Sequence, residues 1–134
     1  MTAKYMLDTN VVSAIVSRRS EKLLEKVTAT PPGQFCVSAI TAGEIEFGLA
    51  LRPEATRLRH AVSLFMAEVN ILPWNGEVAL SYGRLRARLV KAGLELGSID
   101  MLIAAHSLHE GRILVTNDKA FFAIPGFAVE DWNA

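Results

Sequence analysis

Four acidic side chains in this sequence stand where carboxylates could act together. Asp8 and Asp118 each follow a short apolar segment with the composition of a strand, and Glu44 and Asp100 lie near expected helix starts. Two unscreened carboxylates at ~4 Å repel each other by on the order of 4 kcal/mol at an effective dielectric constant of about 20. A cluster of such groups needs a bound cation or shifted pKa values. These residues therefore favour the chemistry of a divalent metal site.

The available donors favour a hard cation. No cluster of His or Cys at ligand spacing accompanies the acids, so we expect Mg²⁺, with Mn²⁺ as a substitute, rather than Zn²⁺. Mg²⁺ usually keeps several waters, which leaves room for a phosphate oxygen and an attacking water. This is the arrangement for metal-assisted phosphodiester hydrolysis. Asn10, Thr116 and Asn117 would orient waters or the phosphate from behind the acids.

Each acid also has a purely structural explanation. Asp8 and Asp118 could cap the helices that follow them. Glu44 could complete a capping box begun by Thr41, and Asp100 could sit in a first helical turn, where the dipole favours negative charge. Taken singly, capping is the more common role. Taken together, all four can reach one rim, because ligand sites in open parallel sheets gather at the carboxyl ends of the strands.

The histidines and the single cysteine offer no competing site. His106 and His109 lie three residues apart on an expected helix, but no Glu accompanies them at the spacing of a zinc protease motif. We expect both to be packing or partner-contact residues, and His60 to lie on the surface. Cys36 falls within an expected strand, where it is a small core residue.

The elements that must position the acids are short strands alternating with helices. Strands are expected near 5–7, 34–37, 71–74, 112–116 and 128–130. Helices are expected near 21–27, 44–51, 53–69, 76–92 and 99–110, with a helical turn at 119–122. Residues 38–41 supply the start of the helix that contains 44–51. Asn75 is expected to cap the helix at 76–92 and Gly93 to end it. The buried face of that helix is expected to hold Val78, Leu80, Tyr82, Leu85 and Leu89. Such alternation predicts an α/β domain with a central, mostly parallel sheet of about four or five strands and helices on both faces.

Size and composition limit the remaining possibilities. The 134 residues fit one domain, spanning 1–134, and 51% hydrophobic residues suggest that some apolar surface is covered by another chain. No apolar run approaches the ~18 residues of a membrane-spanning helix, and the polar start lacks a signal peptide's apolar region. We therefore expect a cytoplasmic protein without a membrane partner.

Charge is balanced over the whole chain but not locally. The 14 basic and 14 acidic side chains cancel, whereas residues 52–91 hold seven bases and three acids, a local net charge of +4. This could be a solvated helix face or a phosphate-binding surface. If the substrate is RNA, Arg84, Arg86 and Arg88 are the candidate phosphate contacts.

These residues together resemble a known family, the PIN-domain ribonucleases, and within it the VapC-type toxins of type II toxin–antitoxin systems. The ending at 124–132 is similar to the subgroup that cleaves initiator tRNA in the anticodon stem-loop. The segments that carry the resemblance span nearly the whole chain. They are Met6-Leu7-Asp8-Thr9-Asn10, Ser38-Ala39-Ile40-Thr41-Ala42-Gly43-Glu44, Gly48-Leu49-Ala50, Ile99-Asp100-Met101-Leu102-Ile103-Ala104-Ala105-His106 and Leu114-Val115-Thr116-Asn117-Asp118.

The resemblance implies a PIN-like fold and a Mg²⁺-dependent endoribonuclease. It assigns the metal and the reaction to Asp8, Glu44, Asp100 and Asp118, with Asp8 and Asp100 as direct ligands. It also implies a homodimer and a VapB antitoxin that inserts a segment into the active-site groove and represses the operon. We accordingly expect a partner to bury much of 41–65. Asp118 departs from part of the subgroup. Some members have an Asn at the position of Asp118 and a Glu a few residues later, whereas residues 119–121 of this sequence contain no Glu.

Two other functions remain to be weighed. A haloacid-dehalogenase-like phosphatase or a receiver domain also begins with a strand ending in Asp and uses Mg²⁺, and the phosphatase usually places a second acid two residues later. Here that position is Asn10. A phospho-aspartate at Asp8 would identify such an enzyme. A catalytically silent PIN scaffold that only binds an antitoxin or RNA would have lost an acid, and all four are present.

Overall fold

The computed structural model describes residues 3–133 and is built around a five-stranded parallel sheet. Met1, Thr2 and Ala134, which belong to the expected domain 1–134, lie outside the described residues. The strand order is β3 (Asn70–Leu72), β2 (Phe35–Ser38), β1 (Tyr5–Leu7), β4 (Ile113–Val115) and β5 (Val129–Glu130). Every neighbouring pair is parallel. The first strand of the chain is thus the central strand of the sheet.

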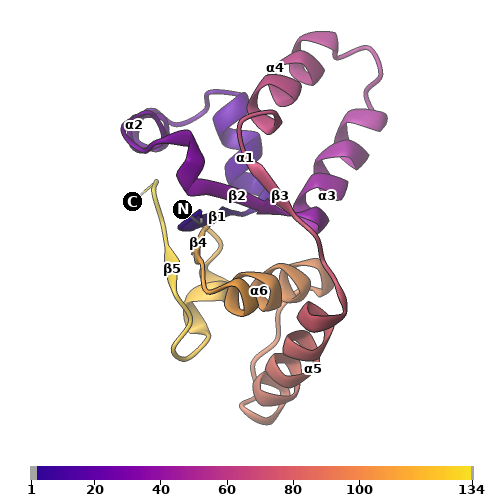
Figure 1. The fold of residues 1–134 in the computed structure, drawn as a ribbon, viewed down its shortest axis with the longest axis vertical. Coiled ribbons are helices and arrows are strands. Elements are labelled where there is room, and N and C mark those ends of the chain that lie inside the picture. The colour runs from indigo at the N-terminus through magenta and orange to yellow at the C-terminus, as the bar shows by residue number, and fades with distance from the viewer. Residues whose placement is uncertain (1–2, 134) are drawn as a thin grey trace.

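Helices cover both faces of this sheet (Figure 1). One side carries α1 (Thr9–Val16), α2 (Glu21–Ala29), α3 (Ala39–Ala50) and α4 (Thr56–Met66), and the other carries α5 (Gly76–Lys91) and α6 (Ser98–Glu110). Two short 3₁₀ helices complete the chain, η1 (Pro32–Gln34) and η2 (Lys119–Ala123). The predicted α/β architecture, mostly parallel and covered on both faces, is confirmed.

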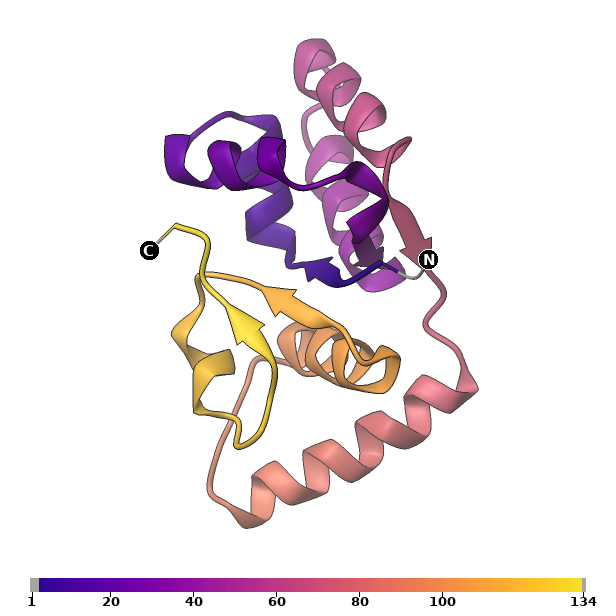
Figure 2. The same ribbon diagram turned by 60° about the vertical axis from the view of Figure 1, so that its left-hand side comes forward.

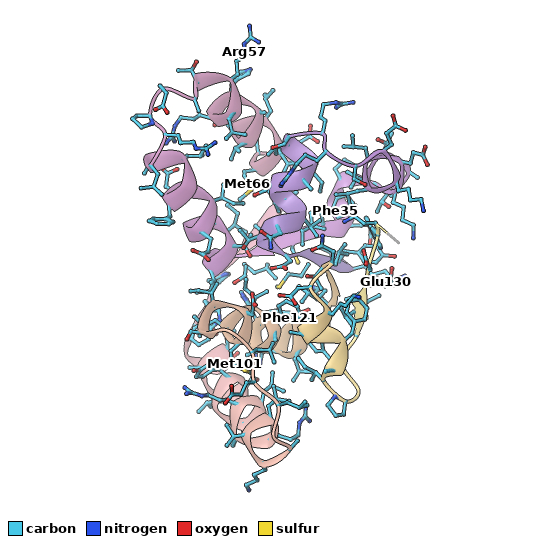
Figure 3. The ribbon with its side chains drawn as sticks, turned by 180° about the vertical axis from the view of Figure 1, so that it is seen from behind. Phe35, Arg57, Met66, Met101, Phe121 and Glu130 are labelled. Atoms are coloured by element: carbon cyan, nitrogen blue, oxygen red, sulfur yellow. The ribbon has the colours of Figure 1, made fainter. Side chains whose placement is uncertain are left out.

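Two hydrophobic cores follow from the alternation of side chains along the strands. One residue of each central strand faces α5 and α6, and its neighbour faces α1 and α2. The first set is Met6, Cys36 and Leu114, and the second is Leu7, Val37 and Val115. Figure 3 shows Met101 and Phe121 on the first side of the sheet and Phe35 and Met66 on the second. Cys36 is a buried core residue, as expected.

The helix boundaries confirm some sequence predictions and correct others. Asn75 Oδ1 accepts the Val78 N–H at 3.1 Å and caps α5, and Gly93, with φ of 72°, follows its end. The start of α3 falls among the expected residues 38–41. Ser38 Oγ accepts the Ile40 N–H at 3.1 Å, so the helix begins at Ala39. Thr41 lies buried inside the helix, which excludes the capping box at Glu44.

The predicted buried face of α5 was also wrong at Leu80, which is 62% exposed. Two residues along a helix correspond to about 200° of rotation, so Leu80 points away from the face that buries Val78. The helix expected over 53–69 is shorter, α4 covering only Thr56–Met66. Within residues 3–133, no helix combines the length and apolar character needed to cross a membrane.

Candidate active site

The strand order places a ligand-binding crevice between β1 and β4. From β1 the chain adds β2 and β3 on one side of the sheet, then crosses to add β4 and β5 on the other. In such sheets ligands bind beyond the carboxyl ends of the strands where this order reverses. Asp8 directly follows β1, and Asp118 follows β4 after a short loop. The fold therefore brings both acids to the crevice.

Asp8 is held in one orientation by two hydrogen bonds. Its Oδ1 accepts the Thr9 N–H at 2.8 Å, so it caps α1, and its Oδ2 accepts the Thr116 hydroxyl at 2.7 Å. The residue is only 3% exposed. Burial raises the pKa of Asp8 and the charge of Asp118 adds to this, while the bonds from Thr116 and Thr9 oppose it. The expected capping role is confirmed, and it leaves a fixed, buried carboxylate at the crevice.

Thr116 links the ends of β1 and β4. Its fully buried hydroxyl donates to Asp8 and accepts the backbone N–H of Asp118 at 3.1 Å. Asp118 in turn caps η2, because its Oδ1 accepts the Ala120 N–H at 3.0 Å. Thr116 thus contacts both acids, and its role in orienting water or phosphate stays a prediction.

Asp100 and Glu44 reach the same crevice from two helices. Asp100 lies in the first turn of α6, which turns tightly into β4 at Gly111 and so begins at the carboxyl edge of the sheet. Burial, followed by the charges of Asp8, Asp118 and Glu44, raises the pKa of Asp100 to about 6. Glu44 is half-buried within α3. Asp100 thus lies within reach of the charges of the other three acids.

The donor set fits a hard divalent cation, although it is not closed around one. Among residues 3–133, no three Asp, Glu, His or Cys side chains converge closely enough to enclose a metal ion. The oxygen donors match Mg²⁺ or Mn²⁺, and a cation would relieve the charge repulsion that adds to burial in raising the pKa of Asp100.

A buried contact between Ser38 and His106 escaped the sequence analysis. His106 Nδ1 lies 2.7 Å from Ser38 Oγ, and burial lowers the pKa of this fully buried histidine. The pair ties the start of α3, which carries Glu44, to α6, which carries Asp100. The packing role expected of His106 is confirmed. Its partner lies 68 residues away, and no local sequence signal reveals it.

We expect Ser38→Ala to destabilise the protein by about 2–4 kcal/mol, because it removes a helix cap and leaves a buried imidazole nitrogen without a partner. The matched control is Ser20→Ala, since Ser20 Oγ caps α2 at Leu23 N–H, 3.3 Å away, and has only that role. Its loss should be about 1 kcal/mol. Urea unfolding measures both, and equal losses would contradict the role given to His106.

The remaining candidate residues lie on the surface. Asn10 and Asn117 are exposed and line a shallow hollow together with Arg19. Arg84, Arg86 and Arg88 are exposed on α5, and Arg86 Nη1 donates to the Tyr82 hydroxyl at 2.9 Å. His60 is exposed as expected, and His109 Nδ1 lies 2.8 Å from Ser81 Oγ.

A parallel five-stranded sheet with acids gathered at its β1–β4 crevice defines a PIN domain. The family model described as PIN domain matches residues 5–126. The chain is also 34% identical over 130 residues to Ribonuclease VapC2 of Haemophilus influenzae, covering 96% of this chain and 98% of that one. The chain therefore belongs to the PIN-domain family and, within it, to the VapC ribonucleases. This membership sets aside the phosphatase alternative.

Two further similarities extend this assignment. The chain is 33% identical over 132 residues to the tRNA(fMet)-specific endonuclease VapC of Salmonella typhimurium, covering 96% of this chain and 98% of the relative. It superposes on the DNA-bound VapBC of Salmonella typhimurium with a TM-score of 0.89 at 30% identity, covering 98% and 99% of the two chains. For VapBC2 of Rickettsia felis, bound to a promoter DNA fragment, the TM-score is 0.86 at 26% identity, covering 94% and 96%.

Proposed function

We propose that this protein is a Mg²⁺-dependent endoribonuclease toxin that cleaves initiator tRNA in the anticodon stem-loop and is neutralised by a VapB-like antitoxin. The observation that carries the proposal is that Asp100 lies close enough to Asp8, Glu44 and Asp118 to feel their charges at the β1–β4 crevice. The tRNA assignment draws support from the relative that is named a tRNA(fMet)-specific endonuclease. The site of action would be the cytoplasm, with residues 1–134 acting as one domain.

In this proposal the four acids hold the metal, Asp8 and Asp100 as direct ligands. When bound, Mg²⁺ supplies charge stabilisation to the phosphodiester and activates an attacking water. Thr116 and the Thr9 N–H keep the Asp8 carboxylate in one orientation. Asn10 and Asn117, exposed beside the crevice, orient water or a phosphate oxygen. The Ser38–His106 contact fixes α3 relative to α6 and so holds Glu44 near Asp100.

A groove between α1, α3 and α4 is suited to the antitoxin. It has a volume of about 340 Å³ and an apolar lining that includes Val12, Leu49 and Val62, and it reaches Glu44. Beside it, Phe47 and Leu51 are 62% and 67% exposed. An inserted segment would cover these side chains and block Glu44. The solved relatives named as VapBC complexes support such a partner, and we propose a toxin homodimer in the same assembly.

The proposal is tested with antitoxin-free, full-length protein and initiator tRNA, with elongator tRNAs as controls. We expect one cut in the anticodon stem-loop, abolished by EDTA and restored by Mg²⁺ or Mn²⁺, and located by sequencing the RNA ends. Cleavage of another RNA alone would overturn the tRNA assignment but keep the nuclease. A folded protein that cuts no RNA under any metal would leave the silent-scaffold alternative.

We expect Thr116→Val to lower kcat/KM for RNA cleavage by about 10- to 100-fold, the usual loss when a partner of a metal-binding side chain is removed. Valine keeps the shape of threonine but cannot donate to Asp8 Oδ2 or accept from the Asp118 N–H. Thr30→Val is the matched control, because its hydroxyl only bonds the Lys26 carbonyl at 2.7 Å. Unchanged cleavage by the Thr116 variant would show that Asp8 needs no such support.

A further inference from the structure

A pocket between α5 and the start of α6 has no role in the function proposed above. We propose that it receives one unpaired base of the RNA, next to the cleaved phosphate, with Tyr82 and Arg86 as the recognising residues. This inference rests on the proposed ribonuclease function and deepens it. Figure 2 shows the segment between the two helices returning from the end of α5 to the start of α6. Residues of this segment line the pocket.

The pocket has the size and lining of a single-base site. Its volume is about 260 Å³, just below the ~300–1,000 Å³ of sites for drug-sized ligands, so it suits a base rather than a whole nucleotide. Apolar side chains make up much of its wall, and an aromatic ring and a guanidinium are added to them. The residues used here are Tyr82, Arg86, Leu94, Leu96, Ser98 and Met101.

Tyr82 and Arg86 are held in place before any ligand arrives. Arg86 Nη1 donates to the Tyr82 hydroxyl at 2.9 Å, and its guanidinium carbon lies 6.0 Å from the ring centre. On another side, the edge of Trp74 meets the Tyr82 ring with centroids 6.0 Å apart, and Trp74 Nε1 donates to the Leu102 carbonyl at 3.0 Å. Splayed RNA bases stack on aromatic rings and guanidinium planes, and a rigid pair loses little entropy in doing so.

The pocket adjoins the acids through the segment that precedes α6. Leu96 and Ser98 line the pocket, and a Cβ placed on Gly97, between them, would lie 3.6 Å from Asp100 Oδ2. Two residues of the pocket wall, Leu96 and Ser98, thus flank Gly97, which lies against Asp100. A base in the pocket would belong to a nucleotide flanking the phosphate at Asp100.

The structure separates the three arginines that the sequence grouped together. Arg86 is two residues from each of the others and so about 160° around α5 from both, whereas Arg84 and Arg88 are only about 40° apart. Of the three, Arg86 lines the pocket. Arg84 and Arg88 therefore carry the same charge on the same helix but face elsewhere, which makes them matched controls.

The test uses full-length protein and stem-loop RNAs in which each nucleotide around the cut is made abasic in turn. Wild type should lose about 5- to 100-fold in kcat/KM at one flanking position, as removal of one base–aromatic stack does. Tyr82→Leu and Arg86→Gln should show this loss on the intact RNA and no further loss at that position. Arg84→Gln and Arg88→Gln should keep the wild-type abasic profile, whatever they lose in overall rate.

Tyr82→Phe is a second variant that keeps the proposal testable if Tyr82→Leu does not fold. It keeps the ring but releases Arg86, so its loss should be smaller than that of Tyr82→Leu, with thermal melts confirming the fold. The subsite is overturned if the profiles of the Tyr82 and Arg86 variants match those of Arg84→Gln and Arg88→Gln, provided that wild type cleaves. If wild type cleaves no RNA at all, the proposed function itself fails.

Discussion

Replacing Asp8 by asparagine is expected to lower kcat/KM for RNA cleavage by about 10³-fold while the protein stays folded. A metal ion contributes several kcal/mol of transition-state stabilisation, and each 1.4 kcal/mol is tenfold in rate. Asn is as good a helix cap as Asp, so its side-chain oxygen can still accept the Thr9 N–H. The change therefore removes the charge that would hold the cation and keeps the helix cap, although the group facing the Thr116 hydroxyl becomes a donor instead of an acceptor.

Cleavage assays and thermal melts of the Asp8 variant separate these effects. Asp131→Asn is the matched control, because Asp131 is the one aspartate outside the candidate site and its Oδ1 accepts the Asn133 N–H at 2.9 Å. That variant should cleave at the wild-type rate. Equal cleavage by the Asp8→Asn variant and wild type would remove Asp8 from the mechanism, and loss of the fold would show that the charge is structural.

Asp100→Asn is expected to abolish cleavage yet stabilise the metal-free protein at pH 7.5. Burial and the charges of Asp8, Asp118 and Glu44 raise the pKa of Asp100 to about 6, against an ordinary value of 3.8. Ionising Asp100 therefore costs folding free energy. Solvent screens part of this cost because Asp100 is only half-buried. We therefore expect Asp100→Asn to raise the Tm by about 2–4 °C, which is roughly 1 kcal/mol of unfolding free energy in a domain of this size.

The pH dependence gives this prediction a definite sign. The folded state holds its proton at Asp100 to higher pH than the unfolded state, so metal-free wild type should lose stability as pH rises from about 4 through about 6. Above that window the contribution is constant. The Asp100→Asn variant should lack this part of the slope. Urea unfolding in EDTA at several pH values measures it, and parallel curves for the two proteins would contradict it.

Mg²⁺ should reverse the order of stability. An ion that binds only the folded state raises Tm by mass action, so Mg²⁺ should raise the Tm of wild type and of Asp131→Asn but not that of Asp100→Asn. This thermal readout is independent of cleavage. A metal-induced shift that survives in the Asp100 variant would place the ion elsewhere.

Local signals made most of the fold predictable. Alternating apolar residues marked the strands, and the turn residues Asn75 and Gly93 marked the ends of α5, because caps act within one helical turn. The start of α3 was predicted only as far as residues 38–41, and the structure identifies Ser38 rather than Thr41 as its cap. The burial of Leu80 was predicted wrongly because Leu80 was grouped with nearby apolar residues, although its rotation around α5 places it on the exposed side.

The candidate site was predictable only in its acids. The rule that ligands gather at the carboxyl ends of strands predicted that the four carboxylates lie at one edge of the sheet. The contacts that orient them join distant parts of the chain, as Asp8 with Thr116 and Ser38 with His106, 108 and 68 residues apart. No spacing encodes such pairs. Helical rotation alone predicts that Arg86 faces away from Arg84 and Arg88. The pocket that Arg86 lines could not be predicted from the sequence.

The bond between Asp8 and Thr116 has a consequence for synthesis of the protein. It joins the first strand of the chain to a segment 108 residues later, and β4 also completes the hydrogen bonding of central β1. Contacts of such long range form late, after the intervening loop has closed. A nascent chain still attached to its ribosome would thus lack the assembled site until most of the sequence has emerged. The assembled site, and any cleavage that depends on it, therefore requires a nearly complete chain.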